Sequence, residues 1–161
     1  MMALYEIMMS SGALCLLQLA QGKPIRGGID VGTGIEADGH LFGAAVVKAY
    51  RLESKTAQYA RVAVGDTLVE YLDVASQSSG SDIRAEFERS IARQLRAIVA
   101  KDDDGSWMLD YLGPASKEIF GGTLPTDMVK MAEEFIEVSR NRWRQEDSKL
   151  FDLARYFDRR V

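Results

Sequence analysis

Apolar residues fill most of the first 20 positions, and beyond them they recur in short runs separated by glycine and polar turns. The segment from Ala3 to Gln21 is apolar nearly all round, and Gly22 and Pro24 directly after it are stop signals for a helix. A helix with so little polar surface has to be covered on more than one side. We therefore predict a helix over 3–21 that lies in the core or in an interface.

The following positions change to the patterns of a strand, a tight turn and a helix. Alternating apolar residues predict strands, and apolar residues three and four apart predict helices. Asp38-Gly39 is a dipeptide typical of tight turns and predicts a short hairpin between Ile35 and Leu41. The expected elements are a glycine-flanked strand over Pro24–Gly32, this hairpin, a helix from Phe42 to about Ser54, a strand over Tyr59–Val64, and a helix over Thr67–Val74 capped by Asp66.

The second half of the chain is predominantly helical in pattern. A polar, flexible connector over Ser76–Ser81 is the candidate internal boundary, so we divide the chain into a partial α+β core (1–75) and a mostly helical C-terminal extension (76–161) packed on the same domain. The expected elements are a helix capped by Asp82 and reaching about Ala100, a turn over Lys101–Gly105, a strand over Trp107–Leu112, and helices over Pro125–Arg144 and Asp147–Arg159.

Composition narrows the function classes. The 161 residues suffice for one domain with a core, and 20 basic against 24 acidic residues give a net charge of −4, so nucleic acid is not expected as a partner. Cys15 is the only cysteine and has apolar neighbours, which indicates a buried thiol and a reducing, cytoplasmic location. With His40 as the only histidine, a Cys/His zinc site is rejected.

No membrane role is expected. The segment before the apolar run Gly12–Ala20 contains Glu6 and no lysine or arginine, so the positive region of a secretory signal is missing. The run is also far shorter than the roughly 20 apolar residues that a membrane-spanning helix needs. A buried helix accounts for it.

The segment Arg26–Glu53 carries the motif with the most chemistry. It reads R-G-G-I-D-V-G-T-G-I-E-A-D-G-H-L-F-G-A-A-V-V-K-A-Y-R-L-E, and it resembles the second half of the catalytic domain of class III nucleotidyl cyclases. The resemblance covers best residues 23–64, and the C-terminal part is similar to small bacterial cyclase-like proteins, some of whose relatives make cyclic pyrimidine nucleotides in anti-phage signalling. It implies a ferredoxin-like, cyclase-type antiparallel sheet without its N-terminal strands, with helices on one face and a helical C-terminal extension.

The resemblance also implies functional residues. In the family, an aromatic-glycine pair, here Phe42-Gly43, opens a helix that carries an asparagine and, four residues later, an arginine; these positions are Val47 and Arg51 here. A guanidinium suits charge that builds on phosphate oxygens, so Arg51 is the candidate catalytic residue, whereas Val47 cannot hydrogen-bond a ribose. His40 stands where the family reads the base. The alternatives are a surface Arg51 paired with Glu53 or a strand carboxylate, and a His40 that is simply a polar loop residue.

The metal half of the family's site is missing from the expected residues. The family holds two Mg²⁺ or Mn²⁺ ions on two aspartates of strands that precede this segment, and only Glu6 is acidic in Met1–Lys23. Asp102, Asp103 and Asp104 do not follow the calcium-loop spacing, and we interpret them as a solvated turn. We therefore expect no metal bound by this chain alone and no cyclisation by it alone.

Three situations would reconcile the arginine half with the missing metal half. The chain is a piece of a longer enzyme, a degenerate domain that forms a homodimer, or the partner of a separate chain that supplies the metal half. The expected ligand is a nucleoside triphosphate. A non-catalytic nucleotide-binding or dimerisation module of the same fold, and an interaction protein that uses its C-terminal helices, are the alternatives.

Overall fold

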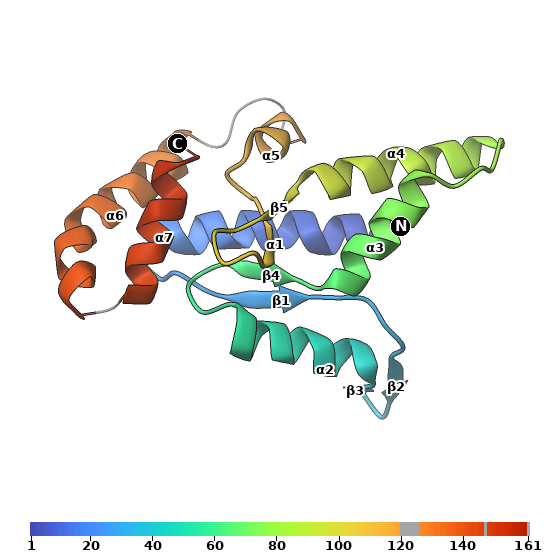
Figure 1. Cartoon of the computed structure of the whole chain (residues 1–161), viewed down its shortest axis with the longest axis horizontal. Helices are drawn as coiled ribbons and strands as arrows, with labels where there is room; N and C mark the ends of the chain where they lie inside the picture. The colour runs from blue at the N-terminus through green and yellow to red at the C-terminus, as the bar shows by residue number, and fades with distance from the viewer. Residues whose placement is uncertain (120–125, 147, 161) are drawn as a thin grey trace.

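The computed structural model describes residues 1–119, 126–146 and 148–160, with side chains described in these ranges except over 141–146 and 148–151. Figure 1 shows helices gathered around a small central sheet. The elements are α1 (Met2–Ala20), β1 (Gly27–Ile29), β2 (Ile35–Ala37), β3 (His40–Phe42), α2 (Ala44–Arg51), the π-helical turn η1 (Leu52–Thr56), β4 (Val62–Val64), α3 (Asp66–Ser76), α4 (Ile83–Ala97), β5 (Val99–Lys101), β6 (Trp107–Leu109), α5 (Pro114–Ile119), α6 (Thr126–Glu146) and α7 (Ser148–Asp158).

The main sheet is mixed, with the strand order β1-β4-β6-β5. Gly28 lies opposite Ala63 in the parallel pair β1–β4, and Ala63 lies opposite Met108 in the antiparallel pair β4–β6. The α+β class is therefore confirmed, and the expectation of an antiparallel sheet is wrong for the β1–β4 pair. The reason is the connection between these strands: it crosses over through α2, and a helical crossover returns the chain parallel to its first strand.

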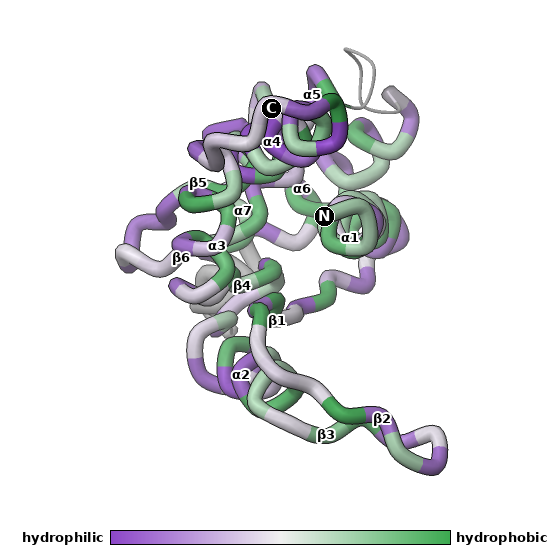
Figure 2. Tube along the Cα trace, turned by 90° about the vertical axis from the view of Figure 1, so that its right-hand side faces the viewer, coloured by the Kyte–Doolittle hydropathy of each residue, from purple (hydrophilic) through white to green (hydrophobic). Residues whose placement is uncertain are grey.

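Helices cover both faces of this sheet, which corrects the expectation of helices on one face. Gly28, Ala63 and Met108 share one face because they are direct neighbours across the strands. A Cβ on Gly28 would lie 2.6 Å from the Cβ of Leu52, so α2 and η1 cover this face at β1. Side chains alternate along a strand, so Leu109 points the other way, toward Gly12 of α1. Figure 2 shows α1 and α2 on opposite sides of the strands.

The apolar N-terminal helix lies in the core, as its pattern predicts. Met8, Cys15, Leu16 and Leu19 of α1 are buried, and burial raises the pKa of the Cys15 thiol to about 12. By length and composition alone α1 would also suffice to cross a membrane, a test that core helices of soluble proteins pass as well. Its contacts with α4 and α6 cover part of its apolar surface, while Met2, Ile7 and Leu14 are exposed by 46%, 54% and 46%.

The predicted hairpin is confirmed, and so are the helices of the second half over their described residues; the predicted helix starts at Pro125 and Asp147 lie outside the described residues. Asp38 and Gly39 have φ values of 53° and 74°, the positive pair that a tight hairpin turn requires, and they join β2 to β3. Three predictions for this half differ from the structure. The helix predicted to reach about Ala100 gives way to β5 at Val99, the strand predicted over Trp107–Leu112 ends at Leu109, and α5 is not predicted. Because β6 pairs with β4, residues beyond the polar connector supply half of the sheet.

Candidate functional site

The helix α2 turns an apolar side toward solvent. Val46, Val47 and Tyr50 are exposed by 42%, 48% and 69%, and Arg51 at the end of the helix is exposed with them. We call these four residues the α2 face. An amphipathic helix usually presents polar residues outward, so this face is unusual for a helix that meets only solvent.

Arg51 lies free on this face. Within the described residues it makes no hydrogen bond and no ion pair. Glu53, which the sequence offered as its partner, instead accepts a hydrogen bond of 2.5 Å from Nε of Arg26, so the paired alternative for Arg51 is wrong. The guanidinium is therefore available to an external anion.

The hairpin β2–β3 places His40 and Phe42 beside the start of α2. The rings of His40 and Phe42 stack with their centroids 6.2 Å apart, and Nδ1 of His40 lies 2.9 Å from the carbonyl oxygen of Asp38. Gly43 has a φ of 121°, and a Cβ there would meet the carbonyl oxygen of Thr33 at 2.5 Å. Glycine at this position therefore serves the sharp entry into α2.

The predicted site residues thus share one region without forming an enclosed cavity. Arg51 lies eight residues beyond Gly43, roughly 12 Å along the helix at 1.5 Å per residue. His40 and Phe42 lie just before Gly43, Val47 lies midway along the helix, and all three are exposed. Their proposed roles in nucleotide binding stay predictions.

Compared with protein-family models, with curated proteins and with solved structures, the chain gives no match.

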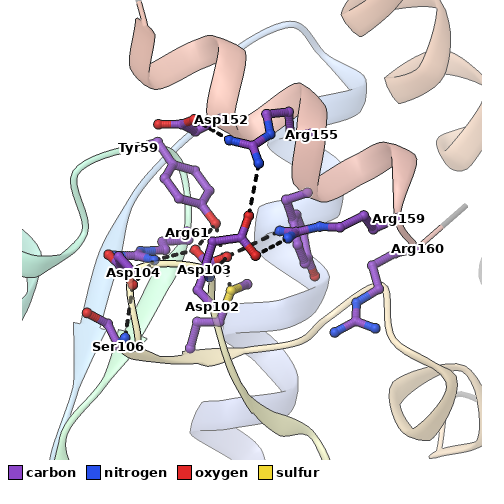
Figure 3. Close-up of polar contacts among 12 residues, drawn as sticks. Tyr59, Arg61, Asp102, Asp103, Asp104, Ser106, Asp152, Arg155, Arg159 and Arg160 are labelled. Atoms are coloured by element: carbon purple, nitrogen blue, oxygen red, sulfur yellow. Dashed lines mark hydrogen bonds and ion pairs between the residues drawn. The ribbon is translucent and has the colours of Figure 1, made fainter.

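The strongest electrostatic feature of the molecule is a cluster that the sequence did not reveal (Figure 3). Arg61, directly before β4, is fully buried, and its Nη1 pairs with Asp102 while Nη2 pairs with Asp104 at 2.5 Å. Nη2 also donates to the carbonyl oxygen of Thr56 at 2.7 Å, at the end of η1. The guanidinium lies 4.8 Å from the centre of the Tyr59 ring.

Asp102, Asp103 and Asp104, which we call the aspartate turn, follow β5. The interpretation as a solvated turn is wrong for Asp102, whose side chain is only 5% exposed. Burial opposes its ionisation, but hydrogen bonds from the Tyr59 hydroxyl and the Asp103 N–H, together with the charge of Arg61, lower its pKa overall. The hydrogen bond from Arg61 is the main cause of the lowered pKa of Asp104. Both carboxylates are therefore held ionised against the guanidinium.

A second layer of arginines comes from the C-terminal helix. Nη2 of Arg159, directly after α7, lies 3.2 Å from Oδ1 of Asp102, and its Nη1 pairs with Asp103. Nη2 of Arg155 lies 3.3 Å from Oδ2 of Asp103. A cavity of about 310 Å³ lies among these groups beside Tyr59. With Asp152, which also lines the cavity, four carboxylates lie near the three arginines Arg61, Arg155 and Arg159, so the cavity offers no excess positive charge to an anionic ligand.

Another carboxylate, Asp30 at the end of β1, is occupied in capping α3. Its Oδ1 accepts hydrogen bonds of 2.9 Å from the N–H groups of Val31 and Leu68, and Nζ of Lys48 lies 3.8 Å from Oδ2. The predicted cap, Asp66, lies inside α3, and Gly65 is the residue at the cap position. A cap that comes from a distant strand leaves no local sequence signal.

The carboxylates of this structure do not fit the pair of metal ions that the cyclase resemblance implies. Within residues 1–119, 126–146 and 148–160, no three side chains of Asp, Glu, His or Cys gather in a way that suits a metal ion. The candidate carboxylates are engaged: the buried side chain of Asp102 and the half-exposed one of Asp104 pair with Arg61, and the buried side chain of Asp30 caps α3. No Mg²⁺ or Mn²⁺ chemistry is therefore assigned to these residues.

The residues of the cluster carry a weak sequence signal at best. Tyr59 and Arg61 alternate in a strand-like segment, and an aspartate-rich turn is common on protein surfaces. Arg61 and Asp102 are 41 residues apart, so their pairing becomes visible only when β4, β6 and β5 are placed side by side. Local patterns do not report such contacts.

Proposed function

We propose that this chain is a nucleotide-binding module of the class III cyclase type that binds a nucleoside triphosphate through Arg51 and does not cyclise it alone. The observation that supports the proposal is the exposed Arg51 guanidinium without a partner, at the end of a helix that enters from the hairpin with His40 and Phe42. A permanently charged, planar donor suits a phosphate. The ferredoxin-like arrangement and the cytoplasmic location belong to the same proposal and rest on the resemblance.

Each of the predicted site residues has a separate role in this proposal. Arg51 binds and orients phosphate oxygens, and the stacked rings of His40 and Phe42 offer a flat surface at the other end of α2 for a base. Val47, between them, supplies apolar contact and no hydrogen bond to a sugar. Because no three described Asp, Glu, His or Cys side chains gather in a way that suits a metal ion, the proposal assigns the steps that the family's metal ions carry out to a second chain or segment.

Replacing Arg51 by alanine is expected to weaken triphosphate binding. Loss of a charge-assisted hydrogen bond costs about 1.5–3 kcal/mol, which corresponds to a dissociation constant roughly 10- to 100-fold higher. Isothermal titration calorimetry with ATP, GTP, CTP and UTP measures the constant. Arg93→Ala is the matched control, because Arg93 is also an exposed helix arginine without a contact in the described structure, on α4.

Absence of triphosphate binding by the unaltered protein would overturn the proposal, and so would an equal effect of Arg93→Ala. Incubation of the protein alone with each triphosphate and Mn²⁺ is expected to yield no cyclic nucleotide. A cyclic product at a rate that depends on Arg51 would contradict the assignment of the metal steps to another chain or segment.

A second candidate function is self-association, favoured by the apolar surface around the hairpin. Ile35, Leu41 and Phe42 are exposed by 67%, 67% and 56%, and they continue the apolar surface of the α2 face. Figure 2 shows the hairpin projecting from the rest of the molecule. Exposed apolar surface of this kind marks interaction sites. The C-terminal helices bury Ala132, Ile136, Leu153 and Phe157 inside the protein, and they expose Met131 and Val138 of α6.

The charges around this surface favour a second copy of the chain as the partner. Glu36 and Asp38 make the hairpin end acidic, whereas Arg51 and Lys55 make the far end of α2 basic, and all four are exposed. A two-fold interface needs a surface that is complementary to itself. This surface meets the condition. A two-fold axis through its apolar middle places the acidic end of each copy against the basic end of the other.

Introducing a charge at Leu41 is expected to disrupt this association. Leu41→Glu adds a carboxylate beside Glu36 and Asp38 and removes an apolar contact, so the dimer dissociation constant should rise at least tenfold, by roughly 1.4 kcal/mol or more. Sedimentation equilibrium measures it. The control is Val74→Glu, since Val74 is 74% exposed on α3, away from the hairpin. A protein that is monomeric at about 100 μM, or that responds only to Val74→Glu, would rule out this surface.

A further inference from the structure

One carboxylate connects the C-terminal helix to the turn that follows Arg51. Oδ2 of Asp102 pairs with Arg61 from the inside of the fold, and Oδ1 of the same group lies 3.2 Å from Nη2 of Arg159 on the outside. Figure 3 shows the two guanidinium groups approaching the aspartate turn from different elements. Asp102 therefore contacts both Arg159, directly after α7, and the buried Arg61.

The inner end of this connection reaches the turn after α2. Arg61 donates from Nη2 to the carbonyl oxygen of Thr56 at 2.7 Å, and Thr56 is the last residue of η1. Arg51 ends α2 and stands directly before η1. A π-helical turn is rare and marks functional positions more often than chance, because its widened backbone has to be held by its surroundings. Arg61 contacts the last residue of this turn, and Arg26 contacts Glu53 within it.

The outer end of the connection is accessible and rests on charge. Arg159 is 43% exposed, and hydrogen bonds to Asp103 and Asp102 raise its pKa against the opposing effect of burial. Arg155 adds a contact of 3.3 Å to Asp103. Water and salt weaken an exposed ion pair more strongly than the buried pair beneath it. The outer pair is thus the point at which the connection can be loosened without breaking the core.

We propose that Arg159 is a positioning residue for Arg51: through Asp102 and Arg61 it holds the turn that follows Arg51, so that docking of α7 sets the affinity of the α2 face for a nucleoside triphosphate. The inference rests on the proposed function of Arg51. The connection is a continuous series of hydrogen bonds from Arg159 to Asp102, from Arg61 to Asp102 and from Arg61 to Thr56. Coupling through such a series changes affinity by about two- to thirtyfold.

The test compares Arg159→Gln with Arg140→Gln in the full chain. Arg140 on α6 lies 2.6 Å from Asp158 of α7, so its replacement also removes an exposed ion pair of the C-terminal helices but leaves the aspartate turn untouched. Hydrogen exchange measures how readily η1 opens, because the N–H of Ala57 donates to the carbonyl oxygen of Leu52 at 2.7 Å and closes this turn. Calorimetry with ATP, GTP, CTP and UTP reads the affinity. Arg159→Lys, which keeps the charge, tests for rescue.

Arg159→Gln is expected to speed exchange over residues 52–57 at least threefold and to raise the triphosphate dissociation constant by about two- to thirtyfold, with Arg140→Gln changing neither and Arg159→Lys restoring part of both. Unchanged exchange over 52–57 in Arg159→Gln would overturn the inference, as would an equal effect of Arg140→Gln. Faster exchange in a protein that binds no triphosphate even when unaltered would support the connection from α7 to the turn and reject the proposed function of Arg51.

Discussion

Replacing Arg61 by methionine is expected to lower the free energy of unfolding by about 3–5 kcal/mol. Arg61 is fully buried and Asp102 is 5% exposed, so removal of the guanidinium leaves an ionised carboxylate inside the protein without its main partner. Methionine fills a similar volume, so the loss reports the charge pair and not a cavity. Urea unfolding followed by circular dichroism measures the change.

Two matched variants separate the buried pair from ordinary ion pairing. Arg84→Met removes an exposed pair in which Nε of Arg84 lies 3.3 Å from Glu88, and it should cost under about 0.5 kcal/mol. Combining Arg61→Met with Asp102→Asn and Asp104→Asn should recover part of the loss, because no unpaired charge then stays buried. If Arg61→Met cost no more than Arg84→Met, the buried cluster would not stabilise the fold.

Acid adds an independent measurement of the same cluster. The pKa values of Asp102 and Asp104 in the folded protein are lowered from 3.8, so their contribution is complete above that value and is lost as the pH falls through the folded-state values. The unaltered protein should therefore lose stability as the pH decreases below about 4. In Arg61→Met the main cause of the lowered pKa of Asp104 is gone, so this acid-dependent loss should be smaller.

The elements that the sequence predicts well are those with a local cause. The hairpin follows from Asp38-Gly39, because these residue types accept the positive φ values that the turn requires. The capped start of α4 follows from Asp82, whose Oδ1 accepts a hydrogen bond of 2.7 Å from the N–H of Ala85. The turn and the cap each involve residues at most three positions apart. A pattern within a short window is enough to reveal them.

The elements that the sequence does not predict depend on distant partners. The apolar pattern of α4 continues into Val99–Lys101, yet these residues form β5. They do so because they pair with β6, which follows the aspartate turn. In the same way, Asp30 caps α3 from 38 positions away, while the adjacent Asp66 makes no capping hydrogen bond. Tertiary contacts override local preference in both cases.

The candidate site shows the same division. The spacing of Val47 and Arg51 places both on one side of a helix, and the structure confirms that both are exposed there. The residues that contact the turn after this helix are distant in sequence: Arg61 donates to Thr56 of η1, and Asp102 pairs with both Arg61 and Arg159. Sequence patterns therefore predict the exposed positions of Val47 and Arg51 but not the distant contacts of the turn that follows them.

The close approach of α2 to β1 at Gly28 gives the second large effect. A methyl group on Gly28 would overlap the carbonyl oxygen of Ala49 and lie 2.6 Å from the Cβ of Leu52 and 2.9 Å from the N of Glu53. Two of these neighbours are backbone atoms that cannot rotate away. Gly28→Ala should therefore cost about 3 kcal/mol, the upper part of the range for overpacking, and should displace the end of α2 that carries Arg51.

The neighbouring Gly27 supplies the control, because it lies in the same strand and neither glycine has a positive φ. A methyl group on Gly27 would meet only Cγ2 of Val62 at 3.8 Å, an ordinary van der Waals contact. Gly27→Ala should thus be neutral or stabilise by up to about 1 kcal/mol through the lower entropy of the unfolded chain. Urea unfolding of both variants decides the matter. Equal stability of Gly28→Ala and Gly27→Ala would mean that α2 does not pack against β1 as closely as the structure places it, and that the position of Arg51 is not fixed by the sheet.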